Sequence, residues 1–111
     1  MKKKRKKKSP IMAERRKKDK EWAIDVKKRA KGHCEVEKCN KRKWLNAHHI
    51  YSRNHMALRH NIENGVALCV KHHFWAHQCG MEFAEWIVNK RGQTWLEGLK
   101  AIKAQSSSVE N

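Results

Sequence analysis

The sequence has no long hydrophobic run. No apolar stretch reaches the roughly 18 residues that a helix needs to span a bilayer. The N-terminus is basic, but no apolar segment follows it as one would in a secretory signal. These absences predict a cytoplasmic protein without a membrane partner.

Acidic residues are also scarce. Asp and Glu total 11 against 27 Lys and Arg, which leaves a formal net charge of +16. Such an imbalance favours a polyanionic partner, of which nucleic acid is the simplest. We therefore expect the partner to be DNA.

Much of the positive charge lies in an N-terminal arm. Residues 1–20 hold twelve basic and two acidic residues, or +10 of the net charge. Residues 1–12 are expected to be disordered, because like charges repel and the segment buries nothing. Seven residues of the arm are predicted to contact DNA and release its counterions: Lys2, Lys3, Lys4, Arg5, Lys6, Lys7 and Lys8. A solvated tail that only aids solubility is the alternative.

A chain of 111 residues allows one small domain, and a core of this size usually needs additional stabilisation by a disulfide or a bound metal. In a reducing compartment, short-spaced Cys and His favour zinc over disulfides. Cys34 and Cys39 form one pair, and Cys69 and His72 form another. Three thiolates and one imidazole can close a tetrahedral zinc site. Two alternatives stay open: Cys79 could replace His72, or these residues are simply buried.

Histidine is concentrated in one part of the chain. Seven of the eight histidines lie in residues 48–77. Residue types and turn signals predict a strand over residues 44–51, a loop over 52–63, a strand over 66–69 and a helix from about residue 70.

Four of these histidines suit a metal-dependent hydrolase. His73 and His77 are four residues apart, so they project from one face of the predicted helix. His48 and His49 are adjacent in a predicted strand, so they point to opposite faces. The two cannot easily serve one metal together. The natural outcome is one metal ligand and one general base.

These residues resemble the HNH, or ββα-metal, nuclease motif. The resemblance covers about residues 33–78, and the zinc pairs resemble those of small phage-type HNH proteins. It implies that His48 is a metal ligand and His49 the general base. The motif Asn falls on Asn64, fifteen residues after His49. The remaining metal ligands fall on His73 and His77. The implied fold is α+β, with a small treble-clef-like core, a structural zinc and flanking helices.

Two positions depart from the common pattern of the family. Many members have Asp where this chain has His48, and many have Cys where it has His72. The catalytic metal is expected to be Mn²⁺, Ni²⁺, Zn²⁺ or Mg²⁺, and an all-imidazole site favours the transition metals. His72 and His73 point about 100° apart on a helix, so each can serve a separate site. Asn64 is expected to anchor the loop by hydrogen bonds; in some relatives the equivalent Asn binds the metal.

Helices are expected on both sides of this core. The apolar stripe of Trp22, Val26 and Ala30 predicts a helix over residues 13–32 that ends at Gly32. The same spacing predicts further helices over residues 82–90 and around residues 95–102. The nuclease domain is expected to span residues 13–104, and residues 105–111 to be a frayed tail.

The expected activity is hydrolysis of DNA phosphodiester bonds by a metal-dependent endonuclease, in which His49 activates the attacking water. Arg53 and Arg59 are expected phosphate contacts, with a solvated role as the alternative. The rivals are a non-catalytic, zinc-stabilised DNA-binding protein and an RNA-directed nuclease. The resemblance to small phage-type HNH proteins also suggests bacteriophage packaging proteins as partners. It implies the cytoplasm of the host cell as the location. Nicking versus double-strand cleavage, the target sequence and the oligomeric state stay open.

Overall fold

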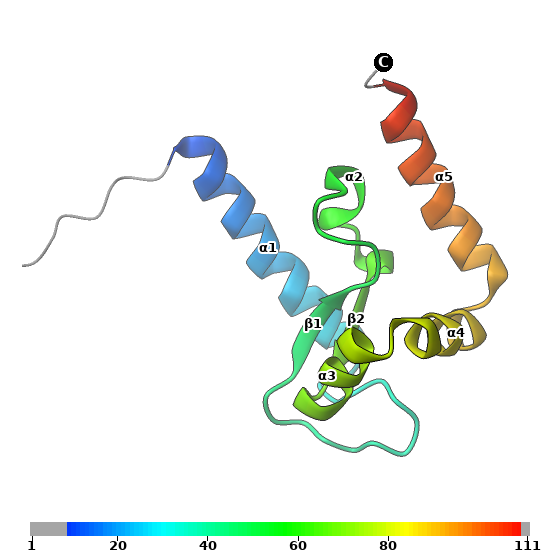
Figure 1. The fold of residues 1–111 in the computed structure, drawn as a ribbon. Helices are drawn as coiled ribbons and strands as arrows, with labels where there is room; N and C mark the ends of the chain where they lie inside the picture. Colours follow the sequence, from blue (N-terminus) through cyan, green and yellow to red (C-terminus); the bar gives the residue numbers. More distant parts are fainter. Residues whose placement is uncertain (1–8, 110–111) are drawn as a thin grey trace, which may run out of the picture.

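A computed structural model describes the backbone of residues 9–109 and the side chains of residues 9–105. It shows a mostly helical α+β protein with a β-hairpin at its centre (Figure 1). In chain order the elements are α1 (Pro10–Arg29), β1 (Asn46–His49), α2 (Met56–Arg59), a 3₁₀ turn (Ile62–Asn64), β2 (Gly65–Leu68), α3 (Val70–Gln78), α4 (Gly80–Arg91) and α5 (Gln93–Val109). None of the helices within residues 9–109 is long and apolar enough to cross a membrane.

The hairpin joins β1 and β2 in antiparallel register, pairing Asn46 with Leu68 and His49 with Gly65. Two strands followed by a helix were predicted, and this order is confirmed, with shorter strands. Before β1, Trp44 has a positive φ of 58° and interrupts the extended backbone. After β1, the backbone N–H of Tyr51 donates to the Asn64 side chain instead of to a strand partner.

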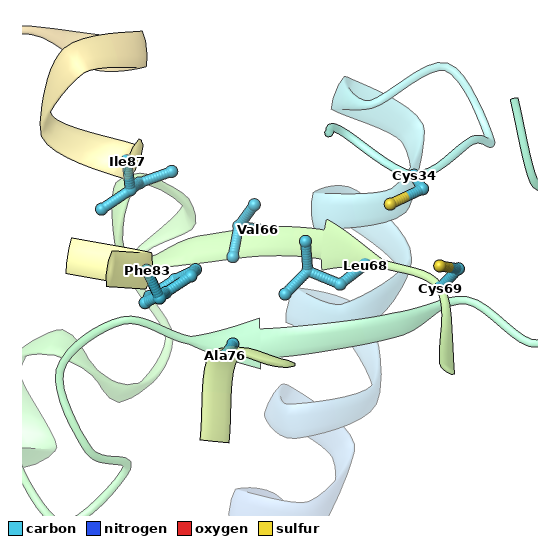
Figure 2. Packing of buried hydrophobic residues seen from close by; sticks show 7 residues of the cluster. All are labelled: Cys34, Val66, Leu68, Cys69, Ala76, Phe83 and Ile87. Atoms are coloured by element: carbon cyan, nitrogen blue, oxygen red, sulfur yellow. The ribbon is translucent and has the colours of Figure 1, made fainter. Parts of the chain in front are cut away.

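Helices cover the hairpin on both faces. On one face, α1 packs through Trp22, Val26 and Ala30 against Ala67 of β2. On the other face lies the larger cluster, which joins the hairpin to α3, α4 and two of the predicted zinc ligands: Cys34, Val66, Leu68, Cys69, Ala76, Phe83 and Ile87. Figure 2 shows Val66 and Leu68 between Phe83 and Ile87 at one end and the two cysteines at the other. The hairpin is therefore covered on both faces, and all four residues of β2 are buried, whereas those of β1 are half-buried.

Helix α1 starts earlier than predicted. The Ser9 side chain accepts a hydrogen bond from the Met12 N–H, and Pro10 occupies the first turn, where its missing N–H costs nothing. The prediction that residues 10–12 are disordered is thus wrong, whereas residues 1–8 lie outside the described part. The helix also ends earlier, at Arg29, and Lys31 rather than Gly32 is the first left-handed residue. The N–H groups of Lys31 and Gly32 then close the end by donating to Lys28 and Lys27.

The remaining boundaries also differ in instructive ways. The predicted loop over residues 52–63 contains the short helix α2 and most of the 3₁₀ turn. Helix α5 continues to Val109 instead of fraying after residue 104, because residues 99–109 contain no Gly or Pro to stop it.

Candidate functional site

The first candidate metal centre is a thiol–imidazole group made of Cys34, Cys39, Cys69 and His72. Its donor atoms lie close together: Cys39 Sγ is 3.9 Å from Cys69 Sγ, and His72 Nδ1 is 3.2 Å from Cys69 Sγ. Zinc bonds of about 2.3 Å to sulfur and 2.0–2.1 Å to nitrogen place tetrahedral donors about 3.3–3.8 Å apart. The donor set and its spacing fit zinc, and the four residues are those predicted.

Two parts of the chain bring these ligands together. Cys34 and Cys39 lie on the linker after α1, where the Cys39 N–H donates to Val36 in a tight turn. Cys69 caps the N-terminus of α3, and His72 lies in its first turn. Burial opposes ionisation of Cys69, but hydrogen bonds from the His72 backbone and the Cys34 thiol outweigh it and lower the pKa of Cys69. Burial raises the pKa of Cys34 to about 11. Cys79 is free and is not among the four.

The second candidate metal centre is the imidazole group of His48, His73 and His77. His48 comes from β1, and the other two come from successive turns of α3. The ring centroids are 4.7–5.1 Å apart, and the Nε2 atoms of His73 and His77 are separated by 3.1 Å. Burial, followed by the charges of His73 and His77, lowers the pKa of His48 to about 4. Imidazoles converging in this way form a nitrogen donor set that could hold a metal.

His49 lies on the opposite face of β1 and takes no part in either group. Its ring stacks on the indole of Trp22, with centroids 3.9 Å apart and planes at 7°. Its Nε2 lies 3.0 Å from the carbonyl oxygen of Arg59. Since a carbonyl can only accept, Nε2–H is the donor, and the neutral ring keeps Nδ1 as its proton acceptor. Burial lowers the pKa of His49, which favours the neutral ring.

Helix α1 fixes the segment to which His49 donates. The Asp19 carboxylate accepts two hydrogen bonds of 2.8 Å from the Arg59 guanidinium and one of 2.7 Å from His60. Trp22 Nε1 donates to the carbonyl of Asn61 at 2.8 Å. These contacts hold residues 59–61 against α1, and with them the carbonyl that orients His49.

Asn64 is completely buried and holds the loop after β1. Its side-chain oxygen accepts from the Tyr51 N–H at 2.7 Å, and its amide nitrogen donates to the carbonyls of Tyr51 and Leu58. This is the anchoring role expected for the loop that follows His48 and His49. A polar side chain without exposure is stable here because its hydrogen bonds are made within the protein.

The predicted DNA contacts have mixed outcomes. Arg53 is exposed in the loop between β1 and α2, where it can meet a ligand. Arg59 does not fit the expected phosphate contact, because its side chain is 13% exposed and paired with Asp19. Arg59 instead pairs with Asp19 and so helps to hold its segment against α1. The arm residues Lys2–Lys8 lie outside the described residues.

A hollow of about 490 Å³ opens beside the imidazole group. His48 and His77 line it, together with Tyr51 of the β1–α2 loop, Phe83 of α4 and Lys100 of α5. No acidic residue lines it. The hollow therefore offers room next to the candidate metal without repelling an anion.

Comparison with known proteins gave no support from relatives: no protein-family model, curated protein or solved structure matches the chain. Function must therefore be inferred from the residues and their geometry.

Sequence reasoning missed the roles of Asp19 and Trp22. Trp22 was predicted to be core, and its stacking on His49 was not foreseen. Asp19 had a usable signal, because it is one of only two acids among the first twenty residues. An isolated acid in so basic a segment indicates a specific partner, but the sequence does not say which of many cations it is.

Proposed function

We propose that this protein is a metal-dependent DNA endonuclease of the HNH, or ββα-metal, type. One observation carries the proposal: the neighbours His48 and His49 have separate surroundings that match a metal ligand and a general base. His48 joins His73 and His77, whereas His49 is oriented by a carbonyl with one nitrogen left to accept a proton. A structural zinc held by the cysteine site (Cys34, Cys39, Cys69 and His72) would not by itself account for either arrangement.

The chemistry follows from these positions. A neutral His49 takes a proton from water through Nδ1 as the water oxygen attacks phosphorus. The bond from phosphorus to the 3′ oxygen breaks, and that oxygen takes a proton from solvent. The products are a 5′-phosphate and a 3′-hydroxyl. A divalent metal held by His48, His73 and His77 would neutralise the charge that develops on the phosphate and leaving oxygen.

The other residues support these roles. Asn64 holds the loop that follows the two histidines, and Trp22 restrains the imidazole plane of His49. Arg53, exposed on that loop, is the proposed phosphate contact. The arm at residues 2–8 adds sequence-independent affinity for DNA through its charge.

The test is cleavage of supercoiled plasmid by zinc-loaded protein with added Mn²⁺, Ni²⁺, Zn²⁺ or Mg²⁺. We expect nicked or linear product carrying 5′-phosphate ends. The double variant His73→Ala, His77→Ala should abolish cleavage while keeping zinc at the cysteine site. Tight DNA binding without cleavage under every metal would instead indicate a non-catalytic DNA-binding protein. Cleavage confined to a matched RNA would refute DNA as the substrate.

A further inference from the structure

Trp44 is unusual among the five tryptophans. Its side chain is 81% exposed, whereas the other four are buried or half-buried. Its backbone is left-handed, with φ of 58°, a conformation that is rare for a bulky side chain. Exposure of a large apolar ring and a backbone held in a costly conformation both need an explanation. Each is accounted for if the ring is presented to a ligand.

Cations surround this ring. A hollow of about 420 Å³ is lined by Trp44 with Cys69 and Val70, and by four basic residues: Lys41, Arg42, Lys43 and Lys71. No carboxylate lines the hollow. Within residues 9–109, none of the four cations belongs to an ion pair. The face thus combines an exposed indole with four positive charges that the protein does not neutralise.

The face is also firmly supported. The carbonyl of Lys41 accepts a hydrogen bond of 2.9 Å from the Cys34 N–H, and Arg42 donates to the carbonyl of Lys31. Cys69, a ligand of the candidate zinc site, forms part of the wall. The hollow lies between residues 41–44 of the linker that joins α1 to β1 and residues 69–71 at the start of α3. In Figure 1 this linker passes beneath α3. The cations are therefore attached to the zinc-bearing part of the fold, unlike those of the N-terminal arm.

We propose that this face binds a single strand of nucleic acid, with phosphates on the four cations and one unpaired base stacked on Trp44. Positive charge beside an exposed aromatic ring is the combination that single-stranded nucleic acid recognises. A base within a duplex has both faces covered by its neighbours, so an indole can stack only on an unpaired one. A second copy of the chain is disfavoured as occupant, because each copy carries a net charge of +16.

The binding site stands apart from the proposed nuclease activity, yet it bears on the substrate. Trp44 precedes His48 by four residues, so their Cα atoms lie at most about 14 Å apart. A strand held on this face therefore passes close to the imidazole group. If the chain is a nuclease, its substrate carries an unpaired nucleotide near the scissile phosphate.

The experiment measures binding of the full chain, loaded with zinc alone, to a labelled single strand and to the same strand fully paired with its complement. Gel analysis after each titration checks that the probes are intact. Trp44→Ala should weaken single-strand binding roughly 5- to 150-fold, the usual contribution of one stacked base, and duplex binding less than about twofold. Trp44→Phe should retain most of the affinity. Met81→Ala is the control, because Met81 is 79% exposed on α4 and does not line the hollow.

A charge variant tests the second half of the proposal. Lys43→Ala combined with Lys71→Ala should reduce the slope of log affinity against log salt by about 1.4 for the single strand. Equal losses for single strand and duplex in Trp44→Ala, or no loss, would overturn the proposal. So would sedimentation showing that Trp44→Ala dissociates a dimer. None of these results depends on cleavage, so failure of the nuclease proposal would be seen separately.

Discussion

His48 and His49 are adjacent residues with the same side chain, but their surroundings differ. His48 meets two other imidazoles, and His49 meets an indole and a carbonyl. Strand alternation alone explains this separation, so it could be predicted from the sequence. The i, i+4 spacing of His73 and His77 was equally sufficient, because a helix repeats every 3.6 residues.

The Asp19–Arg59 pair could not be predicted in the same way. The two residues are 40 positions apart, and the pair forms only after α1 has packed against the hairpin. Local patterns do not encode such a contact, so Arg59 was predicted to meet phosphate. The fold uses it to fix the carbonyl beside His49 instead.

At the residue scale, Asp19→Asn tests this pair. Hydrogen bonds from Arg59 hold the pKa of Asp19 well below its usual range. The pair therefore stabilises the fold at pH values above about 3.9, the pKa of an unfolded Asp, and loses this effect as pH falls further. We expect Asp19→Asn to lower the free energy of unfolding by about 1–2 kcal/mol at pH 7.

Denaturant unfolding of both proteins from pH 7 to pH 2 provides the measurement. The difference between wild type and variant should shrink below pH 4. Both proteins must still hold zinc at each pH that is compared, which metal analysis checks, because loss of the zinc would itself unfold them. A difference that stays constant across the range would show that the carboxylate charge contributes nothing.

At the scale of elements, α1 is the helix that covers one face of the hairpin. It lies so close to β2 that a Cβ on Gly65 would meet the Trp22 ring at 2.7 Å and would also clash with Val26. The apolar stripe of α1 was visible in the sequence, but its partner was not. Periodicity marks which face of a helix is buried and says nothing about what covers it.

Gly65→Ala is the prediction at this scale. The added methyl group should push α1 from the hairpin and destabilise the fold by about 1–3 kcal/mol. Gly98→Ala is a matched control on α5, where no atom lies within 4 Å of the added Cβ and alanine favours the helix. Thermal unfolding should show Gly65→Ala below wild type and Gly98→Ala at or above it. The reverse order would mean that α1 does not pack against β2.

At the scale of the whole molecule, α3 links two centres of different chemistry. Its first turn supplies His72 to the thiol group, and its next residue, His73, joins the imidazole group. Both ligand sets could be predicted: short spacings indicate the pairs within each set, and the resemblance to the HNH motif joined His48 to His73 and His77. The hollow beside His48 and the exposed face at Trp44 could not, because distant elements build them.

The two centres should be separable. Thiolate-rich zinc sites contribute to folding, so Cys69→Ser should lose zinc and unfold. His77→Ala should keep one equivalent of zinc and a wild-type circular dichroism spectrum, because His77 is exposed at the surface of α3. Metal content by mass spectrometry, measured together with the spectrum, distinguishes them. Equal unfolding of both variants would contradict the existence of two independent centres.

The single-turnover rate of plasmid cleavage by His49→Ala tests whether His49 is the general base of a nuclease. We expect a loss of roughly 10²- to 10⁴-fold, with DNA affinity and metal content unchanged. His49→Gln guards against a folding defect by retaining side-chain bulk on Trp22, and His55→Ala, in the loop that follows β1, should cut like wild type. A His49→Ala protein that cuts DNA at nearly the wild-type rate would contradict the claim.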